Sequence, residues 1–221
     1  MLQNIIYVLT LKKIPELNWS SKYEYNLKPK KITLFYLILG LFLFGIGEAL
    51  LITASIGVSP WFVLHQGLAF KTGYSIGITT FIISVAVLIF WFPLKQKPGI
   101  GTILNAILIS VVIDLSLFVL PYPKDFWLQL LQVIFGILLI GIGSGYYLAA
   151  NLGPGPRDGL MTGLNKQTNL SLALIRTILE LSAVVIGFYL GGIVGIGTII
   201  YAVGIGFSVS LGLFIIGKFY K

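Results

Sequence analysis

Six ionisable side chains lie within or beside long apolar segments of this 221-residue chain. They are Glu48, Asp114, Arg157, Asp158, Arg176 and Glu180. Because a charge in an apolar span is costly, such residues mark ligand pathways, proton relays or internal ion pairs. The planar guanidinium of arginine suits a carboxylate or oxyanion, and a buried carboxylate can take up and release a proton. The set predicts recognition of a charged small molecule.

We assign Arg157 and Arg176 as the predicted anion contacts, and Glu180, Asp158 or Glu48 as gating or proton-linked carboxylates. Arg176 and Glu180 are four residues apart, so they share one helix face and can pair. The alternative is an ion pair that only neutralises both charges, with a bridge to Asp158. Glu48 could equally be held by a serine or the backbone. Asp114 lies late in its span, and we predict a packing or capping role.

The elements that must position these residues occur twice in the chain. When residues 39–118 are placed without a gap on residues 135–214, an offset of 96 positions, 26 of the 80 pairs are identical. Glycines and prolines recur in register, whereas the charges do not, and Arg157 corresponds to Trp61. Internal duplication in an apolar chain is typical of transporter and channel folds built from two equivalent halves.

Composition places the chain in a membrane. It is 57% hydrophobic and 10% charged, whereas soluble domains are about 25% charged. Six stretches are long and apolar enough to cross a bilayer core, which takes roughly 20 residues. They are residues 32–54, 75–93, 100–121, 126–150, 170–190 and 196–216. The sequence therefore predicts an all-α polytopic membrane protein with six transmembrane helices, three in each repeat.

The basic residues are distributed unevenly about these spans. Twelve of the fifteen lysines and arginines fall on the side that holds the amino terminus, which the positive-inside rule places in the cytoplasm together with the carboxyl terminus. We therefore interpret the net charge of +8 as basic residues that set the orientation of the protein in the membrane and contact anionic lipid headgroups. It does not predict a nucleic-acid partner. Because each repeat has three spans, the second inserts upside down, and we predict inverted-topology repeats.

A segment too short to cross the bilayer follows the first span of each repeat, at residues 57–73 and 153–169. Each begins with a glycine followed by a proline three positions later, and the pairs are Gly57 with Pro60 and Gly153 with Pro156. Proline in the first turn starts a helix, so we predict half-helices whose amino-terminal N–H groups attract anions. We include these four residues in the predicted substrate site.

Two alternatives remain for these segments. They could be tight connections at the membrane surface, because glycine and proline form ordinary turns. They could also be full crossings, which would give eight spans and place Lys95 and Lys97 outside, against the charge rule. We favour a basic cytoplasmic arm (residues 1–31), a first membrane repeat (32–121) and a second (122–221) within one membrane domain.

Several kinds of site are disfavoured by composition. The chain has no cysteine and one histidine, His65, which argues against thiolate or histidine metal centres. The recurring Gly-Ile-Gly strings lie in apolar helices, not in strand-to-helix turns, so they predict close helix packing and no dinucleotide site. No catalytic triad or acidic pair at catalytic spacing is present. We therefore expect no enzymatic activity and no cofactor.

The string NLGPGPRDGLMTGL (residues 151–164), followed by Arg176, Glu180 and GGIVGIGTIIYAVGIG (residues 191–206), resembles the YczE/YyaS/YitT family of bacterial membrane proteins. The GVSP and GIGTILNA strings of the first repeat fit the same pattern. The resemblance covers about residues 32–216 and leaves the basic arm outside. It implies an inner-membrane protein of transporter-like organisation, but it supplies no substrate.

These observations lead to one functional hypothesis and two alternatives. We expect a small secondary transporter or exporter of a polar, anionic or zwitterionic metabolite, bound near the midplane between the half-helix amino termini. A proton or another ion is a candidate for coupling, and a homodimer is a candidate assembly. The alternatives are an aquaporin-like channel, although such pores place the half-helix after the second span, and a non-transporting partner of a biosynthetic or assembly complex.

Overall fold

The computed structural model describes residues 14–219, and within them every regular element is a helix, with no strand. The helices are α2 (Lys31–Ala54), α3 (Pro60–Thr72), α4 (Ile76–Trp91), α5 (Ile100–Leu117), α6 (Phe126–Ala150), α7 (Pro156–Thr168), α8 (Leu172–Tyr189) and α9 (Ile196–Phe219). The predicted all-α class is confirmed.

Five helices are by themselves long and apolar enough to cross a membrane, namely α2, α5, α6, α8 and α9. The 16-residue α4 joins α3 across a bend of 116°, and this pair counts as a sixth candidate span. α4 and α5 end before the predicted spans do, at Trp91 and Leu117, because Pro93 and Pro121 cannot continue a helix and restrict the residue before them. Residues 14–219 therefore hold five or six candidate membrane spans.

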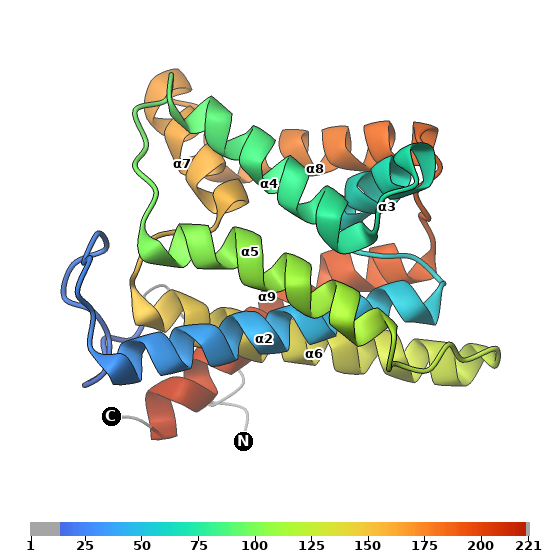
Figure 1. Cartoon of the computed structure of the whole chain (residues 1–221), viewed down its shortest axis with the longest axis horizontal. Coiled ribbons are helices and arrows are strands. Elements are labelled where there is room, and N and C mark those ends of the chain that lie inside the picture. The colour runs from blue at the N-terminus through green and yellow to red at the C-terminus, as the bar shows by residue number, and fades with distance from the viewer. Residues whose placement is uncertain (1–13, 220–221) are drawn as a thin grey trace.

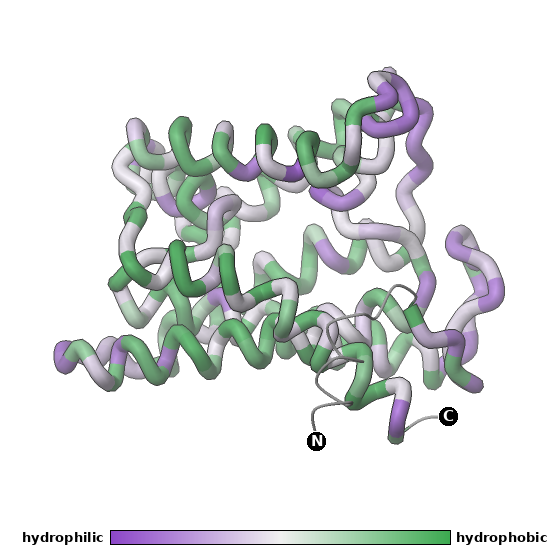
Figure 2. The backbone as a smooth tube through the Cα atoms, turned by 180° about the vertical axis from the view of Figure 1, so that it is seen from behind, coloured by the Kyte–Doolittle hydropathy of each residue, from purple (hydrophilic) through white to green (hydrophobic). Residues whose placement is uncertain are grey.

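The helices form two layers (Figure 1). In one layer α2 packs against α5 and α6, and α6 packs against α9. In the other, α3 packs against α8 and α4, and α7 packs against α4 and α8. Contacts of α4 and α7 with α5 join the layers. Figure 2 shows the same layers from behind, with hydrophobic segments along the helices and hydrophilic residues mostly at their ends.

The break after the first helix has the same form in both halves. α2 and α6 end at residues in the left-handed conformation, Ser55 (φ 59°) and Asn151 (φ 51°). Two residues later Gly57 and Gly153 have φ values of 116° and 107°, which side-chain-bearing residues rarely adopt. A helix of 13 residues with proline at its start then follows in each half. The predicted short helices α3 and α7 are thus confirmed as elements.

Glycines bring α2 and α6 into close contact at two points. A Cβ on Gly40 would lie 2.6 Å from the Gly143 carbonyl oxygen, and one on Gly47 would lie 2.7 Å from the Gly136 carbonyl oxygen. Gly40 and Gly136 are 96 positions apart, as are Gly47 and Gly143, so each contact reproduces the other with the halves exchanged. Small residues at such crossings let two helix backbones pack closely in lipid.

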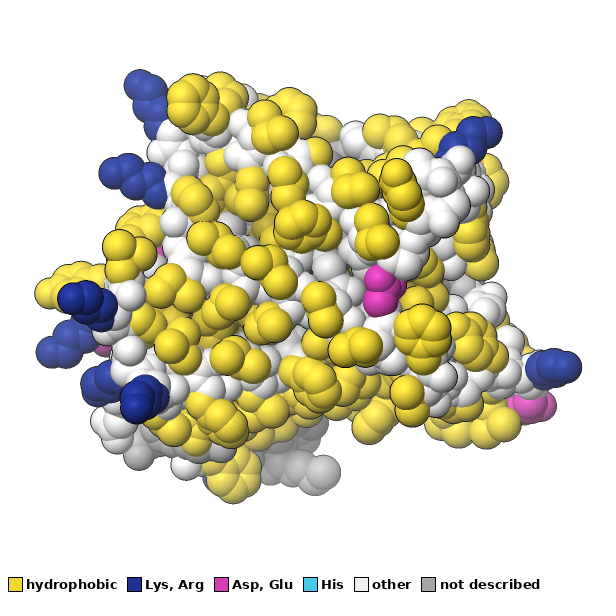
Figure 3. All heavy atoms as spheres, in the orientation of Figure 1, with side chains coloured by type: hydrophobic (Ala, Val, Ile, Leu, Met, Phe, Trp, Pro, Cys, Tyr) yellow, Lys and Arg dark blue, Asp and Glu magenta, His cyan; other side chains and the backbone are white. Residues whose placement is uncertain are grey.

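The surface separates apolar faces from charged ends. Figure 3 shows hydrophobic side chains over the sides of the long helices and lysine or arginine side chains at the two ends of the molecule. Of the predicted basic arm, residues 14–30 are described and residues 1–13 lie outside the described part. Trp19 is buried against Tyr36 and Tyr146, with a ring distance of 4.5 Å to Tyr36. This part of the arm therefore packs onto the start of α2 and the end of α6.

Candidate functional site

A central cavity of about 310 Å³ lies between the two helix layers. Seven pairs of residues that are 96 positions apart line it. The pairs are Phe44 with Ile140, Glu48 with Ser144, Trp61 with Arg157, Phe62 with Asp158, Thr80 with Arg176, Asn105 with Tyr201, and Ile109 with Ile205. Both halves thus contribute equivalent positions to one site, but the side chains at those positions differ. A volume of this size is at the low end for small-molecule sites.

The amino-terminal end of α7 is held at the cavity by contacts from the first half. Gly101 N–H donates to the Leu152 carbonyl oxygen (2.6 Å), and the Thr102 hydroxyl donates to the Pro154 carbonyl oxygen (2.7 Å). The Trp91 indole N–H donates to the Pro156 carbonyl oxygen (2.9 Å). These bonds satisfy backbone carbonyls that could find no partner in lipid. They also fix the turn that presents the residues after Pro156.

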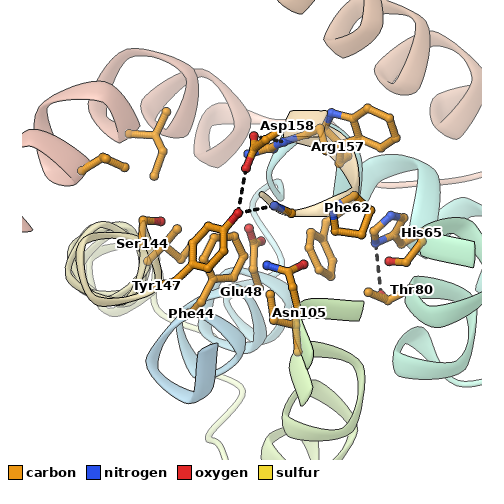
Figure 4. A pocket seen from close by; sticks show the side chains of 18 of the residues that line it. Phe44, Glu48, Phe62, His65, Thr80, Asn105, Ser144, Tyr147, Arg157 and Asp158 are labelled. Carbon is orange, nitrogen blue, oxygen red and sulfur yellow. Dashed lines mark hydrogen bonds and ion pairs between the residues drawn. The ribbon is translucent and has the colours of Figure 1, made fainter. Parts of the chain in front are cut away.

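Polar groups converge on the first turn of α7. The Tyr147 hydroxyl accepts a hydrogen bond from Gly155 N–H and lies 3.4 Å from Asp158 Oδ2. A Cβ on Gly155 would lie 3.3 Å from Asn105 Nδ2, Asp158 Oδ2 and the Tyr147 hydroxyl oxygen. Figure 4 shows Tyr147 joined to this turn, with Glu48 and Asn105 between Tyr147 and Phe62.

Arg157 is the cation of this cluster and is weakly paired. Its Nε atom is 3.8 Å from Asp158 Oδ1, and 29% of its side chain is exposed. Tyr201 lines the same cavity. In the described part of the chain, Arg157 has no other carboxylate within 4 Å. Several of its donors therefore remain available to a bound anion.

Glu48, a residue of α2, lies beside the amino-terminal end of α3, the short helix of the first half. It is 1% exposed, and the Ser59 hydroxyl lies 3.1 and 3.0 Å from its two carboxylate oxygens. Ser59 is the residue that precedes α3, so a carboxyl group of the protein itself sits where the α3 helix dipole attracts negative charge. No cation lies within 4 Å of Glu48 among the described residues. The serine contact that the sequence left open as an alternative for Glu48 is present.

Arg176 and Glu180 form the ion pair that their spacing predicts. Arg176 Nε lies 2.9 Å from Glu180 Oε1. Arg176 lines the cavity, with 47% of its side chain exposed, whereas Glu180 does not line it. The bridge to Asp158 that the sequence allowed does not form, because Asp158 pairs with Arg157 and contacts Tyr147.

Asp114 has the capping role predicted for it. It accepts hydrogen bonds from Gly77 N–H (2.7 Å) and from the Ser75 hydroxyl at the start of α4. A carboxylate is favourable at this position because the amino terminus of a helix carries partial positive charge.

Five of the nine predicted substrate residues line the central cavity, namely Arg157, Asp158, Arg176, Glu48 and Pro156. The other four, Gly57, Gly153, Pro60 and Glu180, do not line it. Gly57 packs against Gly195 and Thr198, and Gly153 packs against Gly99 and Thr102. Both glycines set the path of the chain into the half-helices. Pro60 is buried at the start of α3, where it fixes the helix start.

The sequence interpretation left out several polar residues that line the cavity, among them Tyr147, Tyr201, Asn105 and His65. His65 Nδ1 lies 3.1 Å from the Thr80 hydroxyl, and its ring meets Phe62 edge-on at 4.5 Å. Asn105 and Tyr201 could have been found, because both members of this repeat pair are polar within apolar helices. Residues 14–219 contain no group of three His, Cys, Asp or Glu side chains placed to hold a metal ion.

Comparison with known proteins identifies relatives across most of the chain. The model of a family described as "Family of unknown function (DUF6198)" matches residues 30–213. An uncharacterized protein of Haemophilus influenzae is 39% identical over 205 residues, 93% of each chain. The uncharacterized membrane protein YczE of Bacillus subtilis is 34% identical over 166 residues, 74% of this chain and 77% of that protein.

A second Bacillus subtilis protein, the uncharacterized YyaS, is 29% identical over 169 residues, 75% of this chain and 84% of its own. The resemblance inferred from the sequence motifs is therefore confirmed for YczE and YyaS. No solved structure matches the chain.

Proposed function

We propose that this chain, which belongs to the DUF6198 family and is similar to a membrane protein, is a small secondary transporter of an anionic or zwitterionic metabolite. The family description names no activity, so the proposal is argued from the residues that line the cavity. Arg157 carries this proposal. It is a weakly paired guanidinium at the amino-terminal turn of α7, and it faces a cavity shared by both halves. The helix dipole, backbone N–H groups and guanidinium together suit a carboxylate or phosphate group.

The remaining walls indicate what else the ligand carries. Asp158 beside Arg157 provides an acceptor for an amino group, while Phe44, Trp61 and Phe62 provide apolar and aromatic surface. A cationic group bound against aromatic faces gains cation–π attraction. A zwitterion with a short apolar body therefore satisfies the charges and the walls together.

Inverted-topology repeats are part of the proposal, and reciprocal contacts between the halves support them. Gly197 N–H donates to the Ile56 carbonyl oxygen (2.8 Å), and Gly101 N–H donates to the Leu152 carbonyl oxygen (2.6 Å). Each bond is the other shifted by 96 positions, so the break in each half is bound by the last helix of the opposite half. Three crossings per half then place the two half-helices on opposite sides of a midplane site, as in other transporters with inverted repeats.

The proposal extends to location and coupling. The excess of basic residues at one end supports cytoplasmic termini in a bacterial inner membrane. Glu48, buried at the cavity with a serine as its hydrogen-bond partner, is the proposed proton-linked carboxylate. Neutralisation of Glu48 should therefore remove the sensitivity of transport to proton uncouplers while ligand binding persists.

The test is flux measured in proteoliposomes that hold wild type, Arg157→Lys or Arg157→Gln. The cargo is found first by comparing the metabolites taken up and exported by cells that lack or overproduce the protein. We expect saturable flux in wild type and at least a tenfold loss in both variants, because lysine keeps the charge but loses the planar fork. Lys97→Gln in an exposed loop is the control. Wild-type flux by Arg157→Gln would overturn the assignment.

Two other results would replace the proposal by one of the alternatives. Flux that does not saturate would indicate a channel. Absence of flux for every metabolite that responds in cells, together with a stable partner that co-purifies, would indicate an accessory role.

A further inference from the structure

The two halves differ in how their last two long helices meet. In the first half α4 packs against α5, whereas in the second half the equivalent helices α8 and α9 are not packed against each other. The contact in the first half is close, because a Cβ on Gly77 would lie 2.2 Å from the Ser110 carbonyl oxygen. Asp114 closes it by accepting hydrogen bonds from Gly77 N–H and the Ser75 hydroxyl.

The second half keeps the serine of this closure but lacks its glycine and its carboxylate. The residues equivalent to Gly77 and Asp114 are Ala173 and Ser210, so the close-packing glycine and the carboxylate are both absent. Ser171, equivalent to Ser75, accepts a hydrogen bond from Leu174 N–H (3.3 Å), just as Ser75 accepts one from Ile78 N–H (3.1 Å), but only Ser75 also donates to a carboxylate. A Cβ on Gly206, the equivalent of Ser110, would have no neighbour within 4 Å.

The central cavity extends into this space between α8 and α9. Its lining includes Arg176 on α8 together with Gly206 and Val209 on α9. Arg176 takes the position that Thr80 has in the first half, and its ion pair with Glu180 lies at the edge of the opening. A charged pair at the edge of an apolar opening indicates a place that water or a polar ligand reaches, since such a pair in contact with lipid alone would be costly.

We propose that the space between α8 and α9 is the portal by which ligand reaches Arg157, and that the Asp114 tie holds the equivalent portal between α4 and α5 shut. This inference rests on the proposed transport function. In a protein built of inverted repeats, the opposite state arises when the two halves exchange conformations around a fixed site. α8 then closes on α9 while Gly77 and Ser75 release Asp114.

The proposed orientation in the membrane assigns one portal to the external side and the other to the cytoplasmic side. α4 begins where the chain has crossed once, on the external side, so the Asp114 tie shuts the external portal. α8 begins on the cytoplasmic side, and Arg176 lies near its start. The structure is therefore the inward-open state, in which Asp114 is a positioning residue that acts through α4 and not through the ligand.

The repeat supplies a matched pair of reporter positions, and the chain has no cysteine to remove. Gly206→Cys places a thiol in the open portal, and Ser110→Cys places one at the equivalent closed position. Val203→Cys is the control for labelling from the lipid side, because Val203 on α9 is 81% exposed and lies outside the cavity. The probe is a charged, membrane-impermeant thiol reagent applied to right-side-out and inside-out vesicles.

We expect Gly206→Cys to react in inside-out vesicles at least tenfold faster than Ser110→Cys or Val203→Cys. Adding Asp114→Ala should raise the rate of Ser110→Cys in right-side-out vesicles at least tenfold and lower that of Gly206→Cys. Asp114→Asn, which keeps one acceptor oxygen, should give a smaller shift and serves if the alanine variant does not fold. Equal rates at positions 110 and 206, or rates that neither Asp114 variant changes in folded protein, would overturn the inference.

The labelling readout needs no substrate, so its failure is separate from failure of the proposed function. Reciprocal labelling without flux would support the portal and reject the transporter as assigned. Flux that depends on Arg157 without the labelling shift would support transport and reject the portal.

Discussion

The Trp91 indole nitrogen donates a 2.9 Å hydrogen bond to the carbonyl oxygen of Pro156, so the last residue of α4 is tied to the first residue of α7 across the two halves. The ring of Trp91 also lies against Gly159, where a Cβ would come within 2.0 Å of it. Arg157 follows Pro156 directly. The position of the predicted anion contact therefore depends on a tryptophan of the other repeat.

Trp91→Phe tests this dependence. We expect protein that still folds, because most of the ring packing remains, with transport or ligand affinity lowered by roughly 3- to 10-fold, since one hydrogen bond contributes about 1 kcal/mol. Flux in proteoliposomes and thermal denaturation in detergent provide the measurements. Trp127→Phe is the control, because Trp127 is 68% exposed on the outside of α6. Equal effects of the two variants would show that the bond does not position Arg157.

Gly153→Ala should destabilise the protein by about 1–3 kcal/mol or more, because alanine is strained at a φ of 107°. The added Cβ would also lie 2.8 Å from Gly99 Cα. Gly206→Ala is the matched control, since its Cβ has open space. The measurement is the midpoint of thermal denaturation in detergent. Unchanged stability of Gly153→Ala would mean that the break can take another path.

Cysteines introduced singly at Gln96 and Tyr122 test the orientation. The first lies in the connection between α4 and α5 and the second between α5 and α6, so one crossing separates them. We expect an impermeant thiol reagent to label Tyr122→Cys in intact cells and Gln96→Cys only in inside-out vesicles, as the positive-inside rule requires. Labelling of both from one side would contradict the inverted arrangement.

The Arg176–Glu180 pair should contribute little to stability. Because 47% of the Arg176 side chain is exposed, a double-mutant cycle with Arg176→Gln and Glu180→Gln should give a coupling energy of about 1 kcal/mol or less, within the range of exposed pairs. Denaturant unfolding of the four proteins measures it. A coupling of about 3 kcal/mol or more would instead indicate a buried structural pair and would weaken the case for a portal at this position.

The sequence alone was sufficient to predict the helices, the breaks between them and the Arg176–Glu180 ion pair. The positions of α3 and α7 follow from Gly57, Gly153 and the prolines after them, because these residues act on the backbone within a few positions. The pairing of Arg176 with Glu180 follows from helical spacing. The duplication follows from identities in register. All of these depend on neighbours along the chain.

Only the tertiary structure decided which side chains meet. It brought Tyr147, Asn105 and Tyr201 into one cavity with Arg157 and left Gly57 and Gly153 outside the lining of that cavity. It also separated α8 from α9, while Asp114 held α4 to α5. The physical reason is that apolar side chains in a membrane face lipid and protein alike, so hydrophobic patterning along a span does not reveal its inner face. The sequence determined where the apolar helices lie and where they break, whereas packing between the halves determined which side chains line the cavity.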